Sequence, residues 1–207
     1  MTLCPVRLDI DPLPASPLPV SLDLIKAHCA VDFTDQDELL ETYLLAAITS
    51  FEDTTHRTVF SCAHRWTLKD FPQNRYQQIR LPRGKTQSVQ KIDFVQGGQT
   101  VTLTGASSSP ASDDYQEDLR GDDGGTLMPP RGGSWPSVEF DNPAPVTIHF
   151  TAGWQTAELP PNLLNALLFA VRISLDDMRG SVDPTRHSSN LETLEALVSG
   201  FRLTRFY

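Results

Sequence analysis

The side chains best suited to chemistry in this chain are a few histidines and cysteines. His56, Cys62 and His64 are donor types for zinc, and alternation along a strand would put Cys62 and His64 on one face. A structural zinc site usually has four ligands, commonly including a close cysteine pair, which this chain lacks. A half-buried strand explains these residues better than a metal site. His28 and Cys29 are not a catalytic pair either, because adjacent helical residues do not face each other.

Paired carboxylates are the other candidates for chemistry. Asp113 with Asp114, and Asp122 with Asp123, lie among glycine and serine, where no apolar pocket would raise a pKa for acid–base catalysis. The chain has no phosphate loop, dinucleotide fingerprint, nucleophile elbow or metalloprotease helix. We therefore predict no catalytic residue, no metal and no cofactor, in a protein that is not an enzyme.

Composition indicates a soluble protein of one large or two small domains. The 207 residues include 17 basic and 26 acidic side chains, a net charge of −9 that argues against wrapping nucleic acid. The run "SDDYQEDLRGDD" at residues 112–123 is either a solvated loop or a surface that repels DNA. Three cysteines without paired spacing favour a reducing cytoplasm, and neither a signal peptide nor a membrane span is expected.

The last eight residues, "GFRLTRFY", form an unusual chain end. They carry Phe201, Phe206 and Tyr207, together with Arg202 and Arg205, and no acid. Termini normally fray into water, so exposed aromatic rings at a free end are unexpected. This end either folds back onto its own core or docks on another protein.

Helices are predicted at both ends of the chain. After a Pro-rich extended arm at 1–19, Ser21 caps a short helix, and Thr34 with Asp37 forms a capping box for a long one. The apolar stripe of the long helix is Leu40, Tyr43, Leu44, Ala47, Ile48 and Phe51. A later helix begins near Pro160 or Pro161, ends at Gly180, and has a stripe of Leu164, Leu167, Leu168, Val171, Leu175 and Met178. Ser189 and Glu192 predict a last capped helix that ends at Gly200.

Strands are predicted between the two helical segments. Residues 62–68 and 146–152 alternate with period two, and "VQKIDFVQGGQTVTL" predicts a hairpin that turns at Gly97 and Gly98. Residues 105–134 form an irregular excursion with one or two weak strands. Strands grouped between helices predict an α+β fold with an antiparallel sheet. The expected parts are an arm (1–19), N-terminal helices (20–60), a β insertion (61–155), C-terminal helices (156–199) and a docking tail (200–207).

The order of these landmarks resembles the head-tail connector, or adaptor, family of long-tailed bacteriophages and gene transfer agents. The quoted stretches are "PVSLDLIKAHCAVDFTDQDELLETYLLAAITSFEDTTHRTV", "RWTLKDFP", "IRLPRGKTQSVQKIDFV", "VTIHFTAGW", "LPPNLLNALLFAVRISLDDMRG" and "LEALVSGFRLTRF". Together they span roughly residues 18 to 206. Two departures are Gly200-Phe201-Arg202, where the family often has Pro-Tyr-Arg, and residues 105–134, which match poorly.

The resemblance implies a structural ring of identical subunits, usually twelve, beneath the portal of a virion. Its partners would be the portal protein, a tail-side stopper or terminator, and DNA that passes through the channel without sequence-specific binding. Assembly would take place in the host cytoplasm, without a membrane. The implied portal-binding residues are Phe201, Arg202, Leu203, Arg205, Phe206 and Tyr207. Asp113, Asp114, Glu117 and Asp118 would be channel-lining acids that repel DNA.

Other functions remain open at this point. A stopper or tail-completion protein of the same particle would be mainly β and would lack four helices. A small hydrolase would need a convergent polar constellation, which is not visible. A ligand-binding α+β domain could line a pocket with Trp66, Trp135 and Trp154, although burial in the core is the better expectation for these rings.

Overall fold

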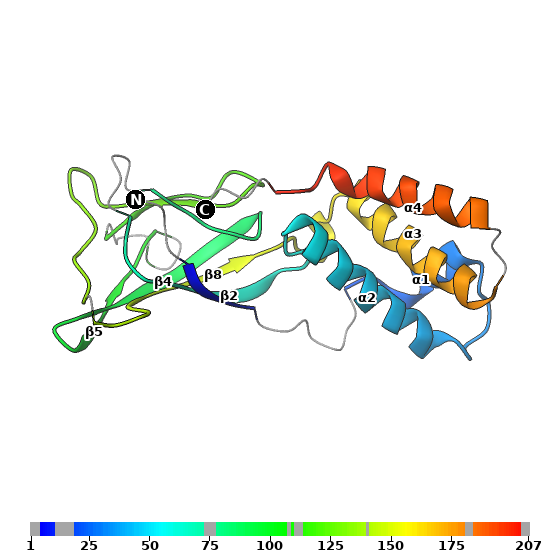
Figure 1. The fold of residues 1–207 in the computed structure, drawn as a ribbon, viewed down its shortest axis with the longest axis horizontal. Helices are drawn as coiled ribbons and strands as arrows, with labels where there is room; N and C mark the ends of the chain where they lie inside the picture. Colours follow the sequence, from blue (N-terminus) through cyan, green and yellow to red (C-terminus); the bar gives the residue numbers. More distant parts are fainter. Residues whose placement is uncertain are drawn as a thin grey trace. The chain divides into compact units, whose positions relative to one another are not determined.

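The chain folds into two compact units in a computed structural model that describes residues 5–10, 19–72, 78–106, 109, 114–139, 141–180 and 184–203. The β unit contains β1 (Pro5–Ile10) and Ser61–Gly153, and the helical unit contains residues 19–60 and Trp154–Leu203 (Figure 1). The β unit is therefore built from two separate stretches of sequence, as is the helical unit. The predicted α+β class, with four helices and antiparallel sheets, is confirmed.

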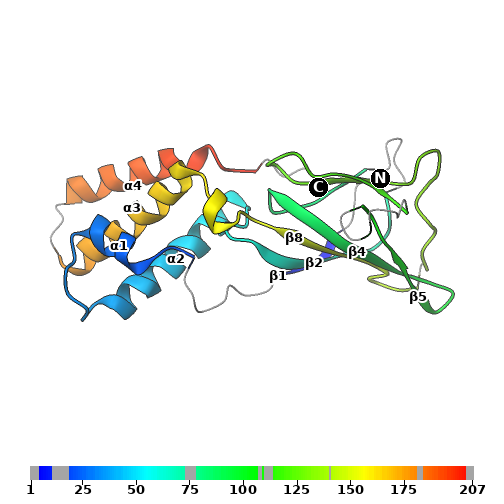
Figure 2. The same cartoon turned by 180° about the vertical axis from the view of Figure 1, so that it is seen from behind.

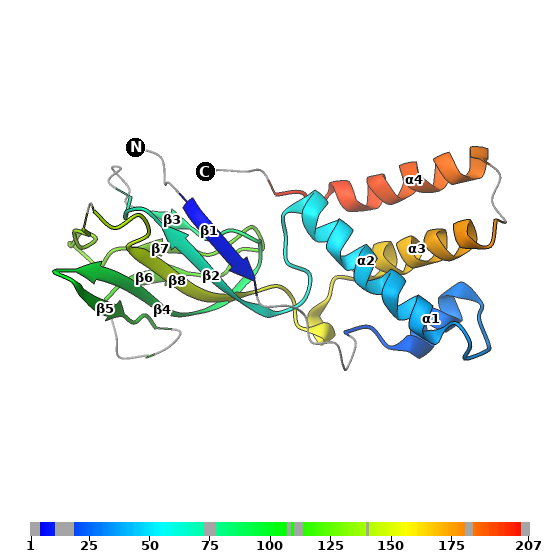
Figure 3. The same ribbon diagram turned by 60° about the horizontal axis from the view of Figure 1, so that its bottom comes forward.

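Four α-helices form the helical unit. They are α1 (Leu22–Cys29), α2 (Asp37–Thr55), α3 (Pro161–Met178) and α4 (Pro184–Ser199), with a short 3₁₀ turn, η1 (Thr156–Glu158), before α3. Figure 3 shows α3 packed between its neighbours, and the buried faces of α2 and α3 supply most of the core. Its members include Ile25, Leu40, Leu44, Ile48, Phe51, Leu163, Leu167, Val171 and Leu175. No helix in the described residues is long and apolar enough to cross a membrane.

The ends of the helices test the predicted capping residues. Ser21 caps α1, and its hydroxyl accepts a hydrogen bond from the Leu24 N–H at 3.3 Å. The capping box at Thr34 was wrong, because α2 begins at Asp37, after Gln36, and Lys26 pairs with the Asp37 carboxylate at 2.8 Å. The box at Ser189 was also wrong, because α4 already begins at Pro184. Proline suits a first helical position, where its missing N–H costs no bond.

Two antiparallel sheets form the β unit. The larger has the order β1-β2-β8-β4-β5, with β2 (Cys62–Leu68), β8 (Val146–Ala152), β4 (Thr86–Gln96) and β5 (Gln99–Leu103) (Figure 2). The smaller has the order β3-β7-β6, with β3 (Ile79–Arg80), β7 (Thr126–Met128) and β6 (Gln116–Asp118). The last two are the weak strands expected within the irregular excursion. Gly97 and Gly98 make the predicted hairpin turn with φ of 60° and 72°.

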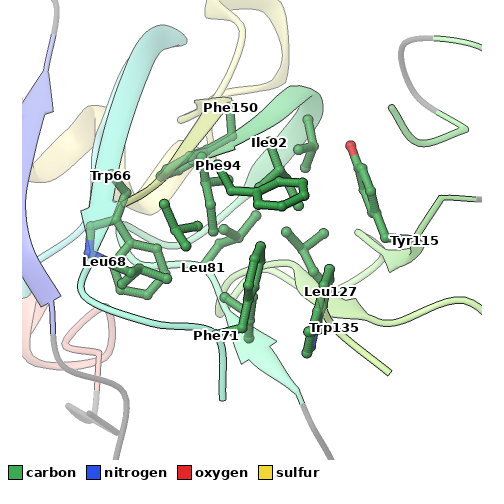
Figure 4. Close-up of a cluster of buried hydrophobic side chains, with 14 of the residues drawn as sticks. Trp66, Leu68, Phe71, Leu81, Ile92, Phe94, Tyr115, Leu127, Trp135 and Phe150 are labelled. Carbon is green, nitrogen blue, oxygen red and sulfur yellow. The ribbon is translucent and has the colours of Figure 1, made fainter. Parts of the chain in front are cut away.

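The core of the β unit lies against one face of the larger sheet. Trp66, Ile148 and Ile92 stand side by side on β2, β8 and β4 and are almost fully buried. Side chains from the smaller sheet and its loops complete this core, including Phe71, Leu81, Tyr115, Leu127 and Trp135 (Figure 4). The Phe71 and Trp135 rings stack with centroids 4.9 Å apart. Region 105–134 therefore adds Tyr115 and Leu127 to the core in spite of its polar composition.

Candidate docking segment and acidic cluster

The start of the predicted docking tail is held by the C-terminal end of α2. The Phe201 ring lies edge-on to Phe51 with ring centroids 5.7 Å apart. The Leu203 N–H donates to the Thr55 carbonyl at 2.9 Å, and the Arg57 guanidinium donates to the Phe201 carbonyl. Residues 201–203 are thus part of the helical unit and not a free end.

Local sequence explains this anchor. The last carbonyls of a helix lack intrahelical partners, so Thr55 in the last turn of α2 can accept from another segment. His56 then turns the chain with a φ of 59°, which brings Arg57 back toward the end of α4. Arg57 is only 6% exposed and lies over the Trp154 ring at 6.0 Å. A buried arginine thereby joins α2, Trp154 and Phe201.

The six predicted portal-binding residues fall into two groups. Phe201, Arg202 and Leu203 lie on the helical unit, where Arg202 pairs with Glu195 at 3.2 Å. Arg205, Phe206 and Tyr207 lie outside the described residues. The assignment of all six to portal binding remains a prediction.

A small apolar pocket opens beside this anchor, and no sequence pattern predicted it. Its volume is about 220 Å³, and α2, α3 and α4 all contribute to its walls. Phe51, Leu167, Leu194 and Val198 line it, with Arg202 and Glu195 among its polar atoms. A pocket of this size and polarity can accept a single apolar side chain.

The predicted channel-lining acids, Asp113, Asp114, Glu117 and Asp118, form the acidic cluster of the β unit. Neighbouring groups partly neutralise the charge of this cluster. The Asp114 carboxylate accepts from the Thr104 N–H at 2.9 Å. Asp118 accepts two bonds from the Arg120 guanidinium, at 2.9 and 3.0 Å, and these bonds with one from the Arg120 N–H lower the pKa of Asp118 to about 2. Glu117 is half-buried on β6, and Asp113 lies outside the described residues. Asp118 is therefore ionised at neutral pH.

The residues considered for metal or thiol chemistry are part of the packing. His64 stacks on Phe150 with ring centroids 5.0 Å apart, and its Nδ1 lies 3.0 Å from the Cys62 carbonyl oxygen. Cys29 is buried, and burial raises the pKa of its thiol. Across the described ranges, no group of three histidine, cysteine or acidic side chains could hold a metal ion.

The three tryptophans are buried, as expected. Trp66 and Trp135 belong to the core of the β unit, with 2% and 6% exposed, and Trp154 belongs to the helical unit with 4% exposed. The three rings belong to two different units, so they do not line a common ligand pocket within either core.

Comparisons with known proteins point to one family. Residues 19–120 match the family model described as phage gp6-like head-tail connector protein. No curated protein matches the chain in sequence.

Solved structures of similar fold come from gene transfer agent particles. A chain of "Neck of empty GTA particle computed with C6 symmetry" is 19% identical, with a TM-score of 0.72 and 98% of each chain covered. A chain of "Virion of native gene transfer agent (GTA) particle" is 20% identical, with a TM-score of 0.67 and 98% of each chain covered. For "Neck of native GTA particle computed with C12 symmetry", identity is 20%, the TM-score is 0.64, and coverage is 100% of this chain and 98% of the other. At these identities the likeness establishes the fold.

The helical unit and the β unit define an α+β protein. Residues 19–120 match the head-tail connector family, which confirms the resemblance that the sequence landmarks predicted. This is a family of structural connectors and not of enzymes.

Proposed function

We propose that this protein is the adaptor that forms a ring beneath the portal and joins the DNA-filled head to the tail of a phage-like particle. The match to the head-tail connector family carries this proposal. Support also comes from the fold, which matches chains of particle necks computed with C6 and C12 symmetry. Those symmetries are compatible with a ring of twelve copies.

The four helices favour an adaptor over the stopper alternative. A stopper was expected to be mainly β, whereas α1 to α4 form a unit with its own core here. The ring would sit in the neck of the virion after assembly in the host cytoplasm. Its tail-side partner would be a stopper or terminator protein, and DNA would pass through the ring without sequence-specific contacts.

In this proposal the C-terminal segment from Phe201 to Tyr207 docks into the portal. Phe201 and Leu203 are already held at α2, so docking pays no further ordering cost for them. Fixing a chain end costs at most about 1–2 kcal/mol per residue, or about 4–8 kcal/mol for the four residues 204–207. Burying Phe206 and Tyr207 at about 200 Å² each and about 25 cal/mol/Å² contributes at most about 10 kcal/mol. One tail therefore binds weakly on its own.

A ring makes weak tails effective. Once one tail has docked, each further docking in the same ring is effectively intramolecular, so the binding becomes tight without any new contact. Arg205 would add charge-assisted bonds to acidic groups of the portal. Arg202 is engaged with Glu195 in the free protein and would have to exchange that partner.

Two truncations test this role and separate docking from folding. Removal of residues 204–207 leaves the contacts of Phe201 and Leu203 intact, so we expect a normal melting temperature and loss of binding to purified portal rings. Removal of residues 201–207 also breaks the anchor at Thr55 and Arg57, so we expect a lower melting temperature as well. Portal binding by the shorter truncation at the level of the full chain would refute the docking role.

A further inference from the structure

The larger sheet of the β unit has an unprotected edge at β5. Natural proteins usually protect such edges with charged residues, proline or bulges, because open backbone groups invite another strand. The β5 sequence, Gln-Thr-Val-Thr-Leu, has none of these residues, and its pairing with β4 has no bulge. Val101 is 38% exposed although it is apolar, and β4 is the sole partner of β5 among the described strands.

The hairpin geometry shows which backbone groups of this edge face outward. In a hairpin with a two-residue turn, the residues that flank the turn, Gln96 and Gln99, exchange hydrogen bonds, and every second pair after them does the same. Val101 therefore bonds to Phe94 on β4. Thr100 and Thr102 are in the pairs between these, so their N–H and C=O groups point away from β4.

The other edge of the same sheet is β1, which pairs with β2 alone among the described strands. Pro5 and a register shift between Pro5 and Arg7 lie at its start, so its regular pairing runs from Arg7 to Ile10, and Val6 is 50% exposed. Its two charges, Arg7 and Asp9, pair with each other at 2.6 Å, so they present no uncompensated charge to a neighbouring strand. Each adjacent pair of strands in the sheet is antiparallel, so β1 and β5 run in the same direction.

A closed ring of identical copies needs two different surfaces on each copy, which contact each other around the ring. We propose that β5 of one copy pairs in parallel with β1 of the next copy, so that the sheets of neighbouring copies join. This inference rests on the proposed ring but goes beyond it, because it names the two strands that make the contact. The two strands run in the same direction, and a small rotation between copies preserves that direction.

A proline at Thr100 tests the contact without disturbing the hairpin. Thr100→Pro removes an outward N–H and is compatible with an edge strand, whereas the matched change Val101→Pro removes a bond to β4. We expect T100P to keep the melting temperature and far-UV circular dichroism of the wild type but to assemble at least tenfold less ring at equal concentration. Thr100→Lys, a second edge-blocking change that keeps the N–H, should act in the same direction. Rings of wild-type yield from a folded T100P or T100K variant would overturn the proposal.

Cysteine cross-linking identifies the partner strand. Arg7 and Thr100 lie on the outer face of the sheet, opposite the core, so cysteines at both positions would lie on the same face of the joined sheets and can be bridged where the register brings them opposite each other. In a background with Cys4 and Cys62 replaced by serine, we expect the R7C/T100C variant to give a ladder of covalent oligomers after oxidation of particles. A mixture of the R7C and T100C single variants should stop at covalent dimers.

The outcomes separate this inference from the proposed function. Rings on electron micrographs with neither a ladder for R7C/T100C nor an effect of T100P would refute the strand contact and leave the ring in place. Dimers from T100C alone would show β5 pairing with β5, which also refutes it. Absence of rings in wild-type particles would refute the proposed function itself.

Discussion

At the scale of single residues, Arg57 is the side chain on which the anchored tail depends most. It is buried, donates to the Phe201 carbonyl and lies over Trp154. Its planar guanidinium offers several donors in a fixed geometry, which lysine cannot reproduce. The anchor is therefore a charged group held inside the helical unit and not only a contact between Phe51 and Phe201.

We expect Arg57→Ala to lower the free energy of unfolding by about 2 kcal/mol, the usual cost of losing a hydrogen bond to a charged group. Arg57→Lys should recover part of that loss. The direct measurement is hydrogen exchange of the Leu203 amide, which is bonded to Thr55 and should exchange faster in R57A. An unchanged exchange rate would mean that Phe201 and Leu203 hold the segment without Arg57.

Gly124 is a second residue with a specific structural requirement. Its φ is +117°, and a Cβ there would collide with the Leu81 carbonyl oxygen. Gly132 also has a positive φ, of +72°, but has open space around it. Gly132→Ala should cost about 1–2 kcal/mol from the backbone conformation alone. Gly124→Ala should cost at least about 3 kcal/mol, because a backbone carbonyl must also move. Urea denaturation measures the free energy of unfolding of both variants. Equal losses for Gly124→Ala and Gly132→Ala would show that the collision with the Leu81 carbonyl is relieved at no cost.

At the scale of elements, the predictions were confirmed where the spacing of the apolar residues fits a single type of secondary structure. The stripe of α2 and the alternation of β2 and β8 both appear as expected, because burial of one face selects one element. Met178 was wrong as a core residue and is 48% exposed, since it lies in the last turn of α3.

Strand β1 was missed for a physical reason. Val6, Leu8 and Ile10 alternate with Arg7 and Asp9, which is a strand pattern, but the prolines around them indicated an extended arm. What decides the structure is pairing with β2, more than fifty residues further along the chain. The apolar pocket and the anchor of Phe201 depend in the same way on contacts between distant segments, which no local pattern encodes.

The outer face of the larger sheet carries a cluster that responds to pH. The Asp93 carboxylate lies 2.7 Å from Lys91 and 3.1 Å from His149 on the adjacent strand. Burial lowers the pKa of His149; Asp93 raises it, whereas Lys91 and Arg65 lower it, and the net direction is downward. The folded protein therefore favours the neutral imidazole.

Stability of the β unit should consequently fall on mild acidification. A histidine whose pKa is lowered by folding contributes stability that is present above its unfolded value, about 6.5, and is lost as the pH falls below it. We expect the melting temperature to drop between about pH 7 and pH 5, and His149→Gln to reduce that drop. His28→Gln, in the helical unit, should reduce the drop by a separate contribution, because burial and Arg172 lower the pKa of His28 too. A wild-type pH dependence in H149Q would assign the effect to another group.

At the scale of the whole molecule, the net charge of −9 is the property most relevant to a DNA channel. Phosphate binding requires clustered cations, and its affinity falls steeply with salt. A ring that presented acids to its channel would let DNA slide without adhesion. Of the acidic cluster that the structure describes, Asp114 is exposed and Asp118 is half-buried on β6.

Charge reversal at two places tests which acids face the DNA. Asp114→Lys with Asp118→Lys changes the net charge from −9 to −5, because each substitution adds two charges. Asp32→Lys with Asp35→Lys gives the same net charge, but on exposed residues of the helical unit. If the β-unit acids line the channel, the first pair should slow DNA release from particles and the delay should shrink as salt is added, whereas the second pair should release DNA at the wild-type rate. Equal rates for both pairs would place Asp114 and Asp118 away from the DNA, since a positive charge in the channel cannot avoid the phosphates.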